Sequence, residues 1–113
     1  MPRNISFSMT TRQFLDQSKT VTRRLGWWDL KPGDVLCGVK KGMGLRKGEG
    51  IKRLGLIKVT SVRRERLESV TAVDVTNEGY PEMWPGEFVK MFYRSHKYEP
   101  DTWVNRIEFK YLE

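Results

Sequence analysis

The run SFSMTTRQFLDQSKTVTRRLGWWDLKPGDVL (residues 6–36) determines the fold that we expect for this chain. It begins inside a short alternating stretch, residues 5–9, whose apolar side chains occupy every second position, as in a half-buried strand: Ile5, Phe7 and Met9. A helical pattern and a second alternating stretch follow, and a Pro-Gly-Asp turn ends the run. This order indicates a domain that mixes helices and strands.

The helical pattern starts at Thr10, which has Gln13 three residues later, the spacing of a capping box. We expect Phe14 and Leu15 to be the buried residues of this short helix. Further elements follow: a strand at about 35–39 after the Pro-Gly-Asp turn, a long strand at 54–67 with β-branched residues, a helix with an aromatic side at 87–96, and a final strand in the closing stretch 102–113, where apolar residues alternate. The final strand should bury one face, which carries Trp103, Ile107, Phe109 and Tyr111.

About five strands and two or three short helices without a βαβ rhythm predict a small α+β domain. Its sheet should be a mostly antiparallel, PUA-like barrel. With 113 residues, we expect residues 1–113 to form a single domain with one modest core. No run of about 18 apolar residues occurs, so we expect no membrane partner. The single cysteine, Cys37, should be a buried small hydrophobe, and such sparing use suits a cytoplasmic location.

The net charge of +7 is concentrated in the first half of the chain. Residues 1–53 hold 12 Lys and Arg against 4 Asp and Glu, whereas residues 54–113 hold 9 against 10. Such asymmetry favours a polyanionic partner, through long-range attraction and counterion release. A solvated basic surface that aids solubility is the alternative.

A glycine-rich basic stretch, KKGMGLRKGEGIKR (residues 40–53), should form a long flexible hairpin loop. It has no Ser or Thr to complete a Walker A motif, and Lys47 stands where a dinucleotide-binding motif needs its third glycine. One histidine, His96, and one cysteine do not make a zinc site. We therefore expect neither a nucleotide cofactor nor a metal.

The stretch KTVTRR (residues 19–24) is the candidate for function. Its threonines can serve simply as strand formers, with the cations on a solvated face. Alternatively, the hydroxyls and the arginine fork line a cleft and bind a phosphate or a base edge. A desolvated lysine near other cations also loses its proton more readily, so Lys19 is a candidate base.

These residues carry a resemblance to a known family. The run 6–36 resembles the start of ASCH domains, small barrels of the PUA-like superfamily, with Lys19, Thr22 and Arg24 matching the motif Gly-x-Lys-x-x-Thr-x-Arg. The chain departs from that motif at Gln17, where the family usually has glycine. TNEGY, which contains Glu78, and the ending RIEFKYLE are similar to later elements of the family.

The resemblance implies two functions. The superfamily binds RNA in a cleft beside the barrel, whereas some small bacterial members remove the acetyl group from acetylcytidine, and other members have been assigned nuclease activity. In an enzyme, Lys19 would accept a proton, Thr22 would be the activated hydroxyl or orient the substrate, and Glu78 would shuttle the proton.

We expect first a domain that binds RNA or single-stranded nucleic acid, and second a hydrolase of a modified nucleoside or of nucleic acid. An acidic protein is a third possible partner. The residues expected to contact nucleic acid are Lys19, Thr20, Thr22, Arg23, Arg24, Trp27, Trp28, Lys40, Lys41, Arg46, Lys47, Lys52 and Arg53. The tryptophans would stack on bases, and the loop cations would hold the phosphates.

Overall fold

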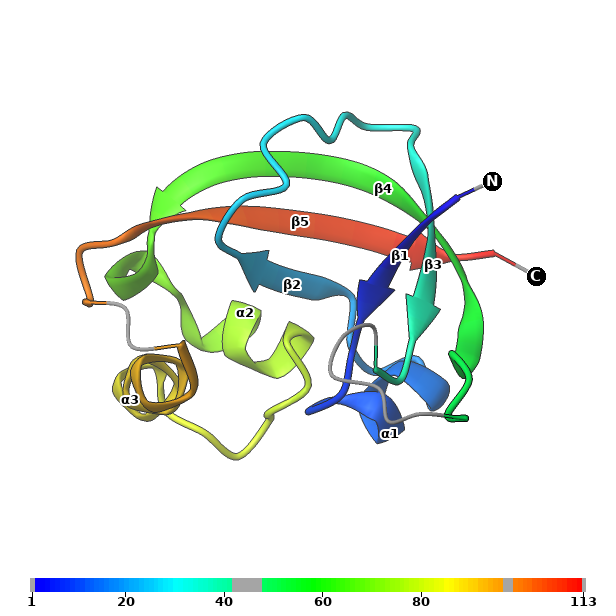
Figure 1. The fold of residues 1–113 in the computed structure, drawn as a ribbon. Coiled ribbons are helices and arrows are strands. Elements are labelled where there is room, and N and C mark those ends of the chain that lie inside the picture. The colour runs from blue at the N-terminus through cyan, green and yellow to red at the C-terminus, as the bar shows by residue number, and fades with distance from the viewer. Residues whose placement is uncertain (1, 42–47, 97–98, 113) are drawn as a thin grey trace.

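The structure, a computed structural model, describes residues 2–41, 48–96 and 99–112 (Figure 1). Five strands form one sheet in the order β1-β3-β4-β5-β2. The elements are β1 (Arg3–Ser6), α1 (Thr11–Leu15), β2 (Val21–Arg24), β3 (Val35–Val39), β4 (Arg53–Arg66), a 3-10 turn (Leu67–Ser69), α2 (Ala72–Asn77), α3 (Pro85–His96) and β5 (Trp103–Tyr111).

The two long strands β4 and β5 form the spine of the sheet and curve over the helices (Figure 1). Their register shifts between Val59 and Ser61, and such a bulge increases local twist. Only β1 and β3 pair in parallel among the described strands; the other pairs are antiparallel. The sheet is therefore a mixed, mostly antiparallel half-barrel, which confirms the α+β fold predicted from the sequence.

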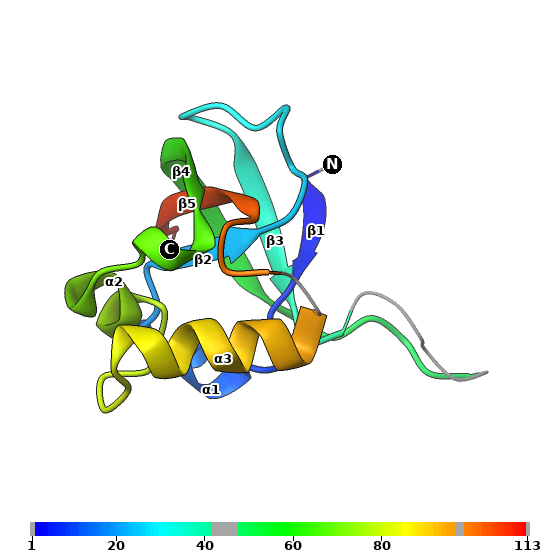
Figure 2. The same ribbon diagram turned by 90° about the vertical axis from the view of Figure 1, so that its left-hand side faces the viewer.

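Two apolar clusters hold this arrangement together. One fills the inside of the half-barrel and is made of Ile5, Phe7, Phe14, Leu30, Leu36, Ile57, Val59, Ile107 and Phe109. The other packs α3 against the sheet and is made of Leu67, Val70, Val75, Phe88, Phe92 and Val104. Val104 and Ile107 belong to different clusters because they lie three positions apart in one strand, and side chains an odd number of positions apart point to opposite faces. Figure 2 shows α3 along its length, with the sheet on one side of it.

Helix α1 docks on the half-barrel through Phe14, whose ring lies over Gly38 of β3. A Cβ atom at Gly38 would come within 2.4 Å of that ring, so glycine allows the close approach. The aromatic ring also contacts Phe7 and Tyr111, with ring centroids 4.7 and 5.0 Å away. This contact places the turn after α1, and with it the start of β2.

Four local predictions from the sequence are wrong. The first strand ends at Ser6, so Met9 lies in a turn and is exposed, and Leu15 of α1 is exposed as well. Thr10 precedes α1 but makes no side-chain capping bond, and the Gln13 side chain donates to the Gly79 carbonyl. Trp103 begins β5 as predicted, yet 45% of its surface is exposed rather than buried in the core.

The stretch predicted as a hairpin loop, residues 40–53, connects β3 to β4, which pair in antiparallel fashion. Residues 42–47 of this loop lie outside the described part of the chain. None of the helices in the described ranges is long and apolar enough to cross a membrane.

Candidate functional site

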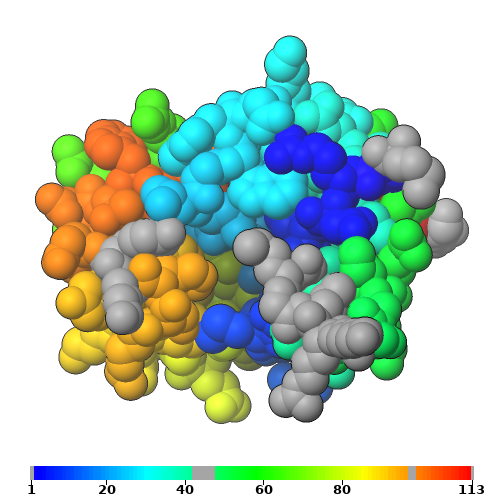
Figure 3. All heavy atoms as spheres, in the orientation of Figure 1, coloured from blue at the N-terminus to red at the C-terminus, as the bar shows by residue number. Residues whose placement is uncertain are grey.

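A hollow of about 150 Å³ opens between β2, the chain that follows β1, the end of α2 and the side of α3 (Figure 3). It is lined by Ser6, Phe7, Ser8, Met9, Thr10, Lys19, Thr22, Arg23, Arg24, Glu78, Tyr80, Phe88, Met91, Phe92, Ser95 and His96. The charged lining residues Lys19, Arg23, Arg24 and Glu78 come from β2, the turn before it and the end of α2, whereas the aromatic residues Phe88 and Phe92 come from α3. The three residues proposed for catalysis therefore meet at one place, although 59 positions separate Lys19 from Glu78.

The turn that precedes β2 brings Lys19 into this hollow. Gln17 has a φ of 63°, the left-handed conformation that glycine adopts most readily. The chain therefore keeps the turn that a glycine would favour, although Gln17 replaces it. After the turn, the Lys19 amide donates to the Gln13 carbonyl at 3.2 Å, and the Tyr111 hydroxyl donates to the Lys19 carbonyl.

Lys19 and Glu78 form a buried ion pair. The Lys19 Nζ donates to Oε1 and to the backbone carbonyl of Glu78, both at 2.8 Å, and both residues are 3% exposed. Burial lowers the pKa of the Lys19 amino group, while attraction to Glu78 opposes the shift. The pair thus places an amine with a reduced affinity for its proton beside a carboxylate.

Thr22 and Arg24 form the next part of the floor. The Arg24 Nε donates to the Thr22 hydroxyl oxygen at 3.0 Å, and one terminal nitrogen of Arg24 donates to the Ser6 carbonyl at 2.6 Å. The Thr22 hydroxyl therefore accepts one bond and keeps its own proton for another partner. Burial lowers the pKa of the Arg24 guanidinium to about 10. Within the described ranges, no hydrogen bond joins Thr22 directly to Lys19.

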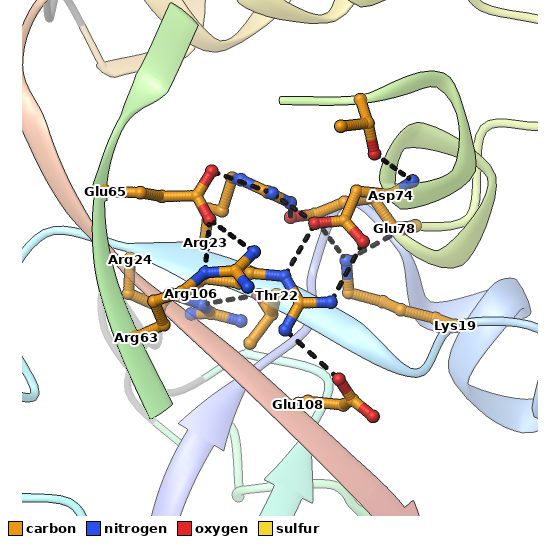
Figure 4. Close-up of polar contacts among 11 residues, drawn as sticks. Lys19, Thr22, Arg23, Arg24, Arg63, Glu65, Asp74, Glu78, Arg106 and Glu108 are labelled. Carbon is orange, nitrogen blue, oxygen red and sulfur yellow. Dashed lines mark hydrogen bonds and ion pairs between the residues drawn. The ribbon is translucent and has the colours of Figure 1, made fainter. Parts of the chain in front are cut away.

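Arg23 lies beneath this floor and is surrounded by carboxylates (Figure 4). Its terminal nitrogens donate to Glu78 at 3.1 Å, to Glu65 at 3.2 Å and to Asp74. Its Nε has no hydrogen-bond partner among the described residues. The fully buried side chain of Arg23 therefore holds the floor together and presents little surface to a nucleic acid.

Arg106 completes the network from the neighbouring strand β5. Its Nε and a terminal nitrogen donate to both oxygens of Asp74, at 2.6 and 2.9 Å, and the other terminal nitrogen donates to Glu108 at 3.1 Å. Hydrogen bonds from Arg106, followed by those from Arg23, hold the pKa of the Asp74 carboxyl well below its ordinary value.

Much of the charge at the floor is paired inside the protein, in contrast to the basic cleft expected from the sequence. Ion pairs join Lys19, Arg23 and Arg106 to carboxylates of Glu65, Asp74, Glu78 and Glu108. Arg24 instead donates to the Thr22 hydroxyl and the Ser6 carbonyl and has no carboxylate partner among the described residues.

A second hollow, of about 300 Å³, is lined by exposed lysines, which form its basic rim. It is lined by Lys40, Lys41 and Lys52, together with Ser8, Glu49 and Gly50. Ser8 lines both hollows, so the described ends of the basic loop lie beside the mouth of the first hollow. Arg53 is exposed at the start of β4, and Arg46 and Lys47 fall outside the described residues.

The remaining predicted contact residues lie away from the lining of the first hollow. Thr20 is half-buried, and its amide donates to the Asn77 carbonyl. Trp27 packs against the core, with the Arg3 guanidinium 4.4 Å from its ring. Trp28 is exposed and lies against Arg64, 4.8 Å from the ring.

Sequence reasoning missed Asp74, Glu65 and Arg106. Asp74 lies in α2, a helix that our sequence reasoning did not locate, although Thr71 accepts a bond from the Asp74 amide in a capping pattern that the sequence displays. Arg106 and Glu65 are charged residues within two of the predicted strands. Their roles come from strand pairing, which the local pattern does not reveal.

Two residues that the sequence analysis did not assign to a site, Cys37 and His96, lie where we expected them. Cys37 is buried in β3, and His96 lies in the last turn of α3, where its ring stacks on Phe92 with centroids 4.3 Å apart. The described ranges contain no group of three or more His, Cys, Asp or Glu residues that could hold a metal ion.

Comparison with known proteins gives the fold of this chain. No family model and no curated protein matches the sequence. Among solved structures, protein EF3133 from Enterococcus faecalis V583 is similar over 99% of this chain and 77% of its own, with a TM-score of 0.70 and 14% identity. Hypothetical protein PH0355 is similar over 99% of this chain and all of its own, with a TM-score of 0.68 and 18% identity.

An ASCH domain from Lactobacillus crispatus JV V101 is similar over 96% of this chain and 79% of its own, with a TM-score of 0.63 and 17% identity. The chain therefore has the ASCH-domain fold, as the resemblance of residues 6–36 indicated. At these identities the likeness describes the fold, and function must be argued from the site.

The turn at Gln17 provides a first test. Replacing Gln17 by glycine should raise the free energy of unfolding by about 0.5–1 kcal/mol, because the left-handed conformation no longer clashes with a Cβ. The side chain is exposed, so little packing is lost. Urea unfolding of Gln17→Gly, with Gln17→Ala as the control, measures this; a glycine variant less stable than the alanine variant would contradict it.

The Asp74 carboxylate provides a second test. Because its pKa is lowered in the folded state, its stabilising effect is present above the ordinary pKa near 3.9 and declines as pH falls below it. Asp74→Asn should therefore be less stable than the wild type at neutral pH, by about 3–5 kcal/mol. The difference should narrow in acid, and urea unfolding across pH measures it. A difference that is independent of pH would show that lost packing, not lost charge, is the cause.

Proposed function

We propose that this protein binds single-stranded nucleic acid, RNA or DNA, and takes one base into the first hollow. The observation that carries this proposal is that aromatic and polar residues line one hollow: Tyr80, Phe88 and Phe92 line it together with Lys19, Thr22 and Glu78. Bases drawn out of a stack are recognised in this way, by aromatic or apolar contact and by hydrogen bonds to their edges.

The size of the hollow supports a single base as its occupant. Pockets for drug-sized ligands span about 300–1,000 Å³. The volume of about 150 Å³ here is smaller and suits a flat group rather than a whole oligonucleotide. The rest of the strand would then lie outside, on the surface.

The second hollow supplies the surface for the rest of the strand. Three lysines, Lys40, Lys41 and Lys52, line it, and Ser8 connects its wall with the first hollow. Each phosphate that a lysine neutralises releases counterions and adds affinity. A base in the first hollow would leave its flanking phosphates close to these lysines. We place this activity in the cytoplasm, in keeping with the single buried cysteine.

Binding to short oligonucleotides tests this proposal. The triple variant Lys40→Gln, Lys41→Gln, Lys52→Gln should bind more weakly, and the slope of log affinity against log salt should fall by about 2, because each contact to a single strand contributes about 0.7. A control with the same change in charge is Lys31→Gln, Lys90→Gln, Lys110→Gln, which alters exposed lysines that do not line either hollow.

Thr22→Val tests the base in the first hollow, since valine keeps the shape and removes the hydroxyl. It should weaken binding of a normal oligonucleotide and leave an abasic oligomer unaffected. Equal losses for both oligomers, or none for either, would argue against a base in the hollow.

Hydrolysis of an amide on such a base is the second candidate function, and the buried pair of Lys19 and Glu78 favours it. In the neutral form, Lys19 would take a proton from a water molecule as the water oxygen bonds to the acyl carbon. The bond from that carbon to the nitrogen then breaks, and the proton passes by way of Lys19 or Glu78 to the departing nitrogen. The Thr22 hydroxyl, which still has its proton to donate, would orient the substrate.

Acetate release from acetylcytidine tests this chemistry. Thr22→Val and Glu78→Gln should abolish most of the rate, whereas Lys90→Gln should leave it unchanged. Because burial lowers the pKa of Lys19, the wild-type rate should rise with pH and level off below the pKa of an ordinary lysine. If the wild type releases no acetate, the proposal of hydrolysis is wrong. The proposal of binding is tested separately, by the oligonucleotide experiments.

A further inference from the structure

A row of alternating tryptophans and arginines lies on the surface at the end of β4 and the start of β5. It consists of Trp28, Arg64, Trp103 and Arg66, which we call the Trp–Arg row. The Arg64 guanidinium lies 4.8 Å from the Trp28 ring and 6.0 Å from the Trp103 ring, and Arg66 lies 4.7 Å from the Trp103 ring. These are cation–π distances.

Strand pairing sets the order of this row. In the pairing of β4 with β5, Arg66 is directly opposite Trp103, and Arg64 is opposite Asn105. The two arginines are two positions apart in β4, so their side chains lie on the same face of the sheet, about 7 Å apart. Trp28 reaches the row from the segment between β2 and β3, which passes beside β4 and β5 (Figure 1). The Asn105 side chain holds that segment by donating to the Trp27 carbonyl at 2.8 Å.

The row is open to solvent and positively charged. Trp28 and Trp103 are 48% and 45% exposed. Neighbouring Arg63 is paired with Glu65, but Arg64 and Arg66 have no carboxylate partner among the described residues, and Arg66 donates instead to the Asp101 carbonyl. Two indoles and two unpaired guanidiniums therefore share one exposed strip.

We propose that the Trp–Arg row is a second binding surface for single-stranded nucleic acid, separate from the two hollows. Exposed indoles stack on bases of any sequence. A guanidinium lying on an indole keeps the edge of its plane free, and that edge donates paired hydrogen bonds to a phosphate. The alternation of ring and cation along the row repeats the alternation of base and phosphate along a strand.

The proposal rests on the same class of partner as the proposed function but not on the hollow itself. Thr22, in the floor of the hollow, is opposite Ile107, and Trp103 lies four residues away along β5, or roughly 13 Å. A strand of a few nucleotides can span that separation. An acidic protein would match the charge of the row, but not its alternation.

Fluorescence anisotropy with labelled single-stranded oligonucleotides tests the row. The double variant Arg64→Gln, Arg66→Gln should reduce the salt slope by about 1.4, because two phosphate contacts are lost. The control Lys90→Gln, Lys110→Gln makes the same change in charge on exposed residues outside the row and should keep the wild-type slope. Trp28→Leu, in a segment outside the sheet, should weaken binding at least about fivefold.

These results separate the row from the hollow. Row variants should still distinguish a normal oligonucleotide from an abasic one, whereas Thr22→Val should lose that distinction and keep the wild-type salt slope. The proposal is overturned if the double variant binds like the wild type, if the control variant loses as much, or if a duplex binds as tightly as the single strand. Binding of acidic peptides but not of oligonucleotides would also overturn it.

Discussion

The guanidinium of Arg23 is the point on which the site depends. Carboxylates from β4, α2 and the end of α2 meet on it, and the last of these, Glu78, also holds Lys19. A buried charge without partners is strongly unfavourable, so the favourable solution is for all these groups to come together. The network thus fastens α2 to the sheet and places the Glu78 carboxylate at the back of the hollow.

This use of Arg23 changes how the charge of the chain is interpreted. The arginines and lysines near the start of β2 looked like a binding surface, but several are neutralised within the protein. Exposed cations remain at the rim of the second hollow and in the Trp–Arg row. Under the proposed function, the floor of the first hollow would form hydrogen bonds with a base, and these exposed cations would contact phosphates.

The two surfaces also differ in how they are held. The floor is held by buried ion pairs that link four elements, whereas the Trp–Arg row is held by stacking of exposed side chains. Under the proposed function, the buried floor would discriminate between bases, because a wrong group leaves buried donors or acceptors unpaired. An exposed row that stacks and donates to phosphates tolerates any sequence. Together they would give a protein that binds a single strand of any sequence and discriminates between bases at one position.

Much of the fold follows from local pattern in the sequence. Alternation predicted β2 and β5, the Pro-Gly-Asp turn before Val35 indicated β3, β-branched residues indicated β4, and the aromatic side indicated α3, because period, residue preference and turn chemistry are local properties. The family resemblance gave Lys19, Thr22 and Glu78 as candidate site residues, whereas their closeness in space, as members of one lining, came from the structure. The left-handed turn at Gln17 was in doubt from the sequence, since glutamine disfavours it, yet the contacts of Lys19 on the far side of the turn maintain it.

Tertiary structure alone decided the rest. Trp103 and Leu15 have the pattern of buried residues, but whether a face is covered depends on what packs against it, and both side chains remain exposed, Trp103 with only arginines stacked on its ring. Arg23 and Arg106 could have been surface cations, and the pairing of β2 with β5 turned both toward Asp74. The sequence by itself determined the elements and the chemistry available to them. Contacts between residues far apart in the chain determined which charged groups form ion pairs inside the protein and which remain exposed.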